Sequence, residues 1–152
     1  MFSLEFSALI AALAITQPIV GKASDVYGRR VFIIAGLVGL VPVLIGEGLV
    51  TQPWQMIVAR ALQGVTSAMV FAPALALAGD LADKEQTGAQ LAVVTMAFGL
   101  GISLGSFFSG YAIKFGYVVP FVTAALLAVI GVLIVKTQVP KYKQQQDIEK
   151  TE

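Results

Sequence analysis

Apolar residues lie along this chain in five long runs, separated by short clusters of charged and polar residues. The runs cover residues 6–20, 31–49, 54–79, 91–113 and 117–135. A helix needs about 20 mostly apolar residues to cross a bilayer. One such run would also suit a buried helix of a soluble protein, but five in succession leave few residues for a water-facing surface. We therefore expect an all-α membrane protein whose residues 1–139 form a bundle of five transmembrane helices.

The segments between these runs are short and mostly polar. They comprise residues 21–30, 50–53, 80–90 and 114–116. Connections of this length make neighbouring helices antiparallel. Residues 140–152 combine lysines, glutamines and alternating charges, and they lack the apolar residues that packing requires. We expect this last segment to form a disordered cytoplasmic tail.

The composition supports a membrane protein and excludes several other classes. Hydrophobic residues make up 57% of the chain and charged residues 12%, whereas a soluble domain is about 25% charged. Ten Lys and Arg against nine Asp and Glu leave no broad positive field, so we expect no nucleic-acid partner. Histidine and cysteine are both absent, which removes the usual bases, thiol nucleophiles and zinc ligands. We expect lipid surroundings, no enzyme activity, no metal site and no bound cofactor, with proton coupling left open.

The basic residues predict the orientation in the membrane, because lysines and arginines are retained on the cytoplasmic side. Lys114 would lie alone on one side of the membrane. Eight basic residues would share the other side: Lys22, Arg29, Arg30, Lys84, Lys136, Lys141, Lys143 and Lys150. This distribution predicts a multi-pass protein of the cell membrane with a cytoplasmic C-terminus and Met1 outside. A chain that starts outside and enters the membrane at once suggests that a preceding helix is missing.

Residues 21–30 form the most specific string in the sequence. They resemble the signature between the second and third helices of major facilitator superfamily transporters, which joins glycines, an aspartate and paired basic residues. The resemblance rests on five positions: Gly21, Asp25, Gly28, Arg29 and Arg30. This chain departs from the signature at Ala23, where leucine is usual, and at Val26, where a basic residue is usual. The resemblance implies a cytoplasmic gate that holds one conformation through contacts between the two halves of a transporter.

The residue types of this string suit a gate. Glycines allow a sharp turn, and Asp25 would lie at the positive N-terminal end of the next helix. The two arginines offer planar donors to carboxylates, and Asp80, at the same side of the membrane, is a candidate partner. The alternative is a basic anchor that fixes orientation and has no moving role.

A second signature lies in the third run, at Arg60, Gln63 and Gly64. It resembles the arginine-x-x-glutamine-glycine motif in the fourth helix of the same family. An arginine in a membrane helix costs at least about 2.5 kcal/mol on insertion scales, so it should face a polar cavity or a partner. Arg60, Gln63 and Ser67 share one helical face and would form an inward polar stripe. In the alternative, Arg60 extends to the outer interface, where we also place Glu47 rather than assign it as a proton carrier.

Small residues line two faces of the fourth run. They are Gly99, Gly101, Ser103, Gly105, Ser106, Ser109 and Gly110. Such residues permit close helix contact. The pattern resembles the fifth-helix motif of exporters in the family, although Ser106 replaces the usual proline and Ser109 a usual glycine. It implies a drug/proton-antiporter-like exporter, and the alternative is an ordinary packing helix.

The three signatures make residues 4–140 similar to helices two to six of the N-terminal six-helix bundle of a major facilitator transporter. We therefore expect a fragment or truncated form that lacks the first helix and the second half. The resemblance implies transport of an unidentified small solute by alternating access. Two alternatives are a small transporter assembled from identical copies and a membrane protein that binds a partner without transporting. The expected partner is accordingly the missing half or a second copy.

Overall fold

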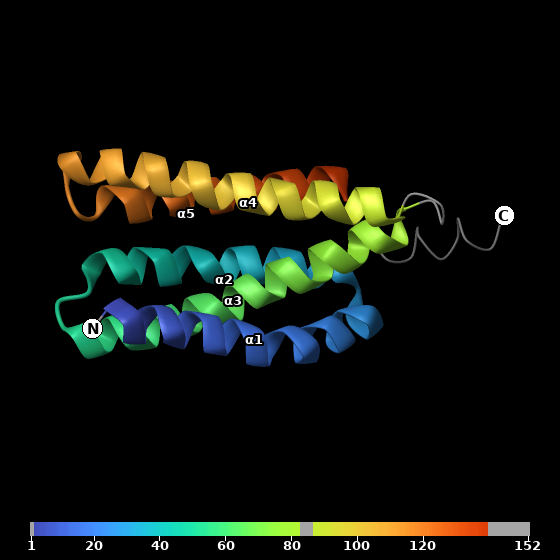
Figure 1. Cartoon of the computed structure of the whole chain (residues 1–152), viewed down its shortest axis with the longest axis horizontal. Helices are drawn as coiled ribbons and strands as arrows, with labels where there is room; N and C mark the ends of the chain where they lie inside the picture. The colour runs from blue at the N-terminus through green and yellow to red at the C-terminus, as the bar shows by residue number, and fades with distance from the viewer. Residues whose placement is uncertain (1, 83–86, 140–152) are drawn as a thin grey trace, which may run out of the picture.

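The computed structural model describes residues 2–82 and 87–139, which form five long helices and a short 3₁₀ helix (Figure 1). They are α1 (Phe2–Tyr27), α2 (Arg29–Leu49), α3 (Pro53–Asp80), α4 (Thr87–Ala112), η1 (Ile113–Phe115) and α5 (Val119–Gln138). All five long helices have the length and apolar composition needed to cross a membrane. The expected all-α architecture with five transmembrane helices is confirmed.

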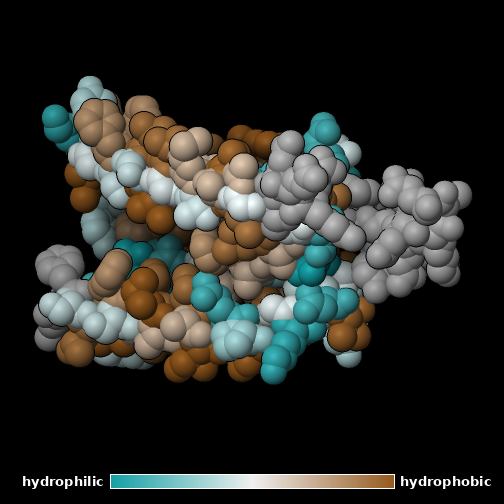
Figure 2. Space-filling view, turned by 45° about the vertical axis from the view of Figure 1, so that its right-hand side comes forward, coloured by the Kyte–Doolittle hydropathy of each residue, from teal (hydrophilic) through white to brown (hydrophobic). Residues whose placement is uncertain are grey.

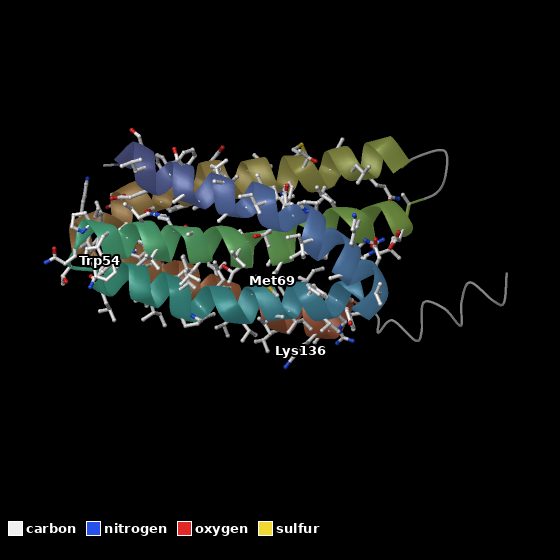
Figure 3. All side chains as sticks on the ribbon, turned by 90° about the horizontal axis from the view of Figure 1, so that it is seen from below. Trp54, Met69 and Lys136 are labelled. Carbon is white, nitrogen blue, oxygen red and sulfur yellow. The ribbon has the colours of Figure 1, made fainter. Side chains whose placement is uncertain are left out.

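The helices form an antiparallel bundle in which α1 packs on α3, α3 on α2, and α2 on α5. Figure 1 shows α1 and α3 on one side of the bundle, α4 and α5 on the other, and α2 between them. We call the end where α1 meets α2 the Gly28 end. The opposite end, where α2 meets α3, is the Trp54 end, and Figure 3 labels Trp54 there.

The connection between α1 and α2 is a single residue, so the expectation of a connecting loop over residues 21–30 is wrong. Gly28 has a φ of 97°, a conformation that glycine adopts without steric cost. Its N–H donates to the Ser24 carbonyl oxygen at 3.0 Å, and the Ser24 hydroxyl donates to the Gly21 carbonyl oxygen at 2.8 Å. No proline or turn dipeptide interrupts the chain from Gly21 to Tyr27, so α1 continues as a helix through the polar residues.

Two glycines on α2 and α3 allow the helices to approach closely. At Gly36, an added Cβ would lie 2.8 Å from the Met69 Cβ and 2.9 Å from the Thr66 carbonyl oxygen of α3. Figure 3 labels Met69 near the middle of the bundle. At Gly64, an added Cβ would overlap the carbonyl oxygen of Leu9 in α1. The core therefore depends on backbone-to-backbone approach, as is typical of membrane helices, while large apolar side chains cover much of the outer surface (Figure 2).

Candidate functional site

Arg29 joins three helices at the Gly28 end. Its Nη1 lies 2.9 Å from Asp25 Oδ1 in α1. Its Nε donates to Asp80 Oδ2 in α3, and its Nη2 donates to Asp80 Oδ1 at 3.1 Å. The guanidinium therefore binds Asp80 with two parallel bonds, the geometry that gives arginine–carboxylate pairs their strength and direction. We call Asp25, Arg29 and Asp80 the Arg29 clamp, and Asp80 is the partner that the sequence suggested.

The position of Asp25 differs from the expectation. The sequence placed it at the N-terminal end of the second helix, but α1 continues to Tyr27, so Asp25 lies in the last turn of α1. A carboxylate there faces the negative end of the helix dipole, which is unfavourable. Arg29, four residues further along the chain, supplies the compensating positive charge.

Arg30 makes a separate contact with α5. Its Nη2 donates to the Lys136 carbonyl oxygen at 2.7 Å, close to the C-terminal end of α5, where helix carbonyl groups lack partners within the helix. Figure 3 labels Lys136 at the end opposite Trp54. Gly21, the remaining residue of the signature, lies inside α1, and an added Cβ there would meet nothing within 4 Å. The two arginines thus connect α2 to different neighbours.

A second polar cluster lies within the membrane-spanning segments, nearer the Trp54 end. Arg60 Nη1 donates to Gln63 Oε1 at 2.7 Å and lies 3.4 Å from Glu47 Oε2 on α2. The Glu47 side chain is fully buried, whereas that of Arg60 is 30% exposed. Figure 2 shows hydrophilic atoms in a hollow between the two sides of the bundle towards this end. Ser67 lies two turns beyond Arg60 on α3 and is half-buried.

Glu47 lies in the last turn of α2, near the Trp54 end, as the sequence predicts. The sequence did not predict that its carboxyl group is buried inside the bundle against α3. Of the two glycines that flank Glu47, Gly48 approaches Val118 and Phe121, whereas an added Cβ at Gly46 would meet nothing within 4 Å. An isolated acidic residue between two glycines, facing a helix that contains an arginine, was the available signal for a buried pair.

The structure does not bring the small residues of α4 into close contact with another helix. An added Cβ at any of four glycines would meet nothing within 4 Å: Gly99, Gly101, Gly105 and Gly110. The intervening Ser103, Ser106 and Ser109 are also exposed. Both small-residue faces of α4 are open, because α4 contacts α3 and α5 only sparsely.

An apolar groove of about 690 Å³ lies between α1, α3 and α4. Its lining includes Gln17 and Pro18 of α1, Phe71 and Leu75 of α3, and Leu91 of α4. Gln17 supplies an amide to a lining that is otherwise apolar.

Removal of the Arg29 side chain should loosen the Gly28 end. The chain has no native cysteine, so Val26→Cys and Leu81→Cys, both at exposed positions, allow two spin labels on α1 and next to α3. We expect a narrow distance distribution in the parent chain and a broader one with Arg29→Ala. Arg29→Lys should be intermediate, because an ammonium group cannot form the two parallel bonds. Lys22→Ala is the control for loss of a positive charge, and an unchanged distribution in Arg29→Ala would contradict the clamp.

Comparisons with known proteins agree with this architecture. The family model described as Major Facilitator Superfamily matches residues 1–152. The chain is 29% identical over 151 residues to a tetracycline resistance protein, class B, from Escherichia coli, covering 97% of this chain and 37% of that protein. It is 30% identical over 129 residues to multidrug resistance protein 2 from Bacillus subtilis, covering 81% of this chain and 32% of that protein.

A triacylglyceride transporter from Mycobacteroides abscessus is 28% identical over 138 residues, which cover 90% of this chain and 27% of that protein. The chain therefore spans about a third of the length of these relatives. Its five apolar helices and its transporter relatives make it an integral, multi-pass membrane protein related to transmembrane transporters. By the match over its whole length, the chain belongs to the major facilitator superfamily.

Proposed function

We propose that this chain is the helix bundle of a transporter that exports a small, largely apolar solute by alternating access, coupled to protons. The observation that carries this proposal is the Arg29 clamp, in which two residues of the family signature, Asp25 and Arg29, join Asp80 and so connect α1, α2 and α3. The printed names of two relatives, which denote resistance to tetracycline and to multiple drugs, support export. The groove between α1, α3 and α4 supports a largely apolar solute.

The contacts at the Gly28 end indicate how such a bundle would move. Arg29 connects three helices, and Arg30 connects α2 to α5, so these four helices are linked at one end. Alternating access would then require the bundle to rotate largely as one body against other helices. The partners of the Arg29 clamp lie within this chain, so the clamp would stabilise the bundle itself and not only its contact with another half.

The open faces of α4 are the surface we assign to those other helices. Small residues there would allow close approach by the second half of a transporter or by a second copy of this chain. The distribution of basic residues supports an orientation in the plasma membrane with the Gly28 end and the C-terminus in the cytoplasm. A transporter needs no bond chemistry, and we propose no enzymatic activity.

Flux through liposomes tests this function directly. If a second copy of the chain supplies the other helices, liposomes containing the purified chain should take up tetracycline faster than empty liposomes when a pH gradient is imposed. This difference should disappear when the gradient is dissipated. Arg29→Ala should lower the flux severalfold at equal protein content, while Lys22→Ala should not. Flux equal to that of empty liposomes, for tetracycline and for a panel of lipophilic cations, would contradict transport by this chain alone.

A further inference from the structure

We propose that Arg30 and Lys136 form a binding site for the phosphate of an anionic phospholipid, at the Gly28 end of the contact between α2 and α5. The bound lipid would stabilise the packing of these two helices. The inference does not depend on transport, because lipid binding by the chain can be measured without any solute.

Charge at the Gly28 end is divided unevenly between the two sides of the bundle. The Arg29 clamp, on the side of α1 and α3, contains two carboxylates for one guanidinium. On the other side, Arg30 belongs to α2 and Lys136 to α5. α5 contains no acidic residue, and the one acidic residue of α2, Glu47, lies in its last turn at the Trp54 end. Neither helix therefore supplies a carboxylate to these two positive charges.

Contact with α5 fixes the position of the Arg30 guanidinium. Its Nη2 donates to the Lys136 carbonyl oxygen at 2.7 Å, so Arg30 lies directly beside the residue that supplies the second charge. Its Nε is buried and has no acceptor in the described part of the chain, so water solvates this guanidinium incompletely. A guanidinium presents a planar fork of donors that matches the oxygens of a phosphate. An added phosphate would supply both acceptors and countercharge.

Both residues lie where the headgroups of a bilayer would be. Arg30 is the second residue of α2, and Lys136 is in the last turn of α5. Both helices are long and apolar enough to cross a membrane, so their ends reach its surface. Figure 3 labels Lys136 at the edge of the bundle, at the end opposite Trp54. Basic side chains between helix ends at a membrane face suit an anionic lipid headgroup.

α5 offers an apolar surface to the acyl chains of the same lipid. Leu133 lies one turn before Lys136, and Val129 lies one turn before Leu133, so the three side chains share one face of the helix. Leu133 is 58% exposed and Val129 is 43% exposed. A phospholipid would fill both the charged site and this apolar face, whereas free phosphate would fill only the charged site.

Native mass spectrometry of the full chain in detergent, titrated with two lipids of identical acyl chains, tests the site. We expect phosphatidylglycerol, which has a net negative charge, to bind more tightly than phosphatidylcholine. Arg30→Ala and Lys136→Ala should each weaken phosphatidylglycerol binding about fivefold, the effect of removing one basic residue near anionic lipid. Lys22→Ala removes an exposed positive charge at the same end of the bundle, and it should leave this binding unchanged.

Lys136→Ala decides the outcome if Arg30→Ala does not fold, because the Lys136 side chain is exposed. Equal binding of the two lipids would overturn the proposal, as would equal losses of binding in Lys22→Ala and Lys136→Ala. Displacement of the lipid by an equal concentration of the free headgroup, glycerophosphoglycerol, would overturn the assignment to a lipid.

The result is also separate from flux. Phosphatidylglycerol binding without tetracycline flux would support the lipid site and contradict transport by this chain alone. Flux without a preference for phosphatidylglycerol would do the reverse.

Discussion

Gly64→Ala should destabilise the bundle by about 1–3 kcal/mol, the usual cost of adding a methyl group to a filled site. A loss of stability is unusual for a glycine-to-alanine substitution in a helix, because alanine is the better helix former by about 0.8–1 kcal/mol. At Gly64, however, the new Cβ would overlap the Leu9 carbonyl oxygen and lie 3.0 Å from the Leu13 nitrogen. Both are backbone atoms, so only a shift of α1 relative to α3 makes room.

Unfolding by SDS in mixed micelles, followed by circular dichroism, measures this effect. Gly99→Ala on α4 is the matched control, because an added Cβ there meets nothing within 4 Å. The control should be as stable as the parent or more stable by up to about 1 kcal/mol. Equal stability of Gly64→Ala and Gly99→Ala would show that α1 and α3 do not approach closely at Gly64.

Arg60→Ala should destabilise the chain still more, by about 3 kcal/mol at a pH where Glu47 is ionised. Removal of one partner of a buried ion pair typically costs about 3–5 kcal/mol, because the other charge stays buried without compensation. The lower end of that range applies because the pair is only partly buried, with the Arg60 side chain 30% exposed. Arg60→Lys retains a positive charge and should therefore lose less stability than Arg60→Ala.

The double variant Arg60→Ala with Glu47→Gln separates two contributions to the stability lost in Arg60→Ala: the uncompensated charge of Glu47 and the lost packing of the Arg60 side chain. We expect Glu47→Gln to restore most of the stability lost in Arg60→Ala in the same SDS titration, since a neutral amide no longer needs a countercharge. A double variant no more stable than Arg60→Ala would contradict the ion pair. Arg60 would then extend to the interface, as in the alternative that the sequence left open.

The sequence predicts the helices of this protein well, because lipid permits only segments whose backbone groups are satisfied internally. Long apolar runs therefore translate directly into helices. The ends of the helices match the ends of the apolar runs less closely, because polar residues such as Asp25 and Lys22 can continue a helix beyond the apolar run. The turn at Gly28 depends on one residue with a positive φ, and composition does not distinguish that glycine from Gly21, which stays helical.

The candidate site was predictable in part. Pairing of an arginine with Asp80 follows from opposite charges at helix ends that antiparallel packing brings together. The burial of Glu47 was not predictable in this way, since it depends on how α2 is rotated about its axis. The open faces of α4 show the same limit: small residues indicate that close contact is possible, but they do not identify the contacting helix.

Three contacts of α2 with α3, spread across the membrane, lie on one stripe of α2. Arg29, Gly36 and Glu47 are spaced by seven and eleven residues, intervals that return a helix to nearly the same azimuth. Arg29 contacts Asp80 at one membrane face, Gly36 meets α3 in the middle, and Glu47 meets Arg60 towards the other face. A small axial rotation of α2 would therefore disturb all three contacts together, so the two polar clusters on opposite sides of the bilayer share one rotational coordinate.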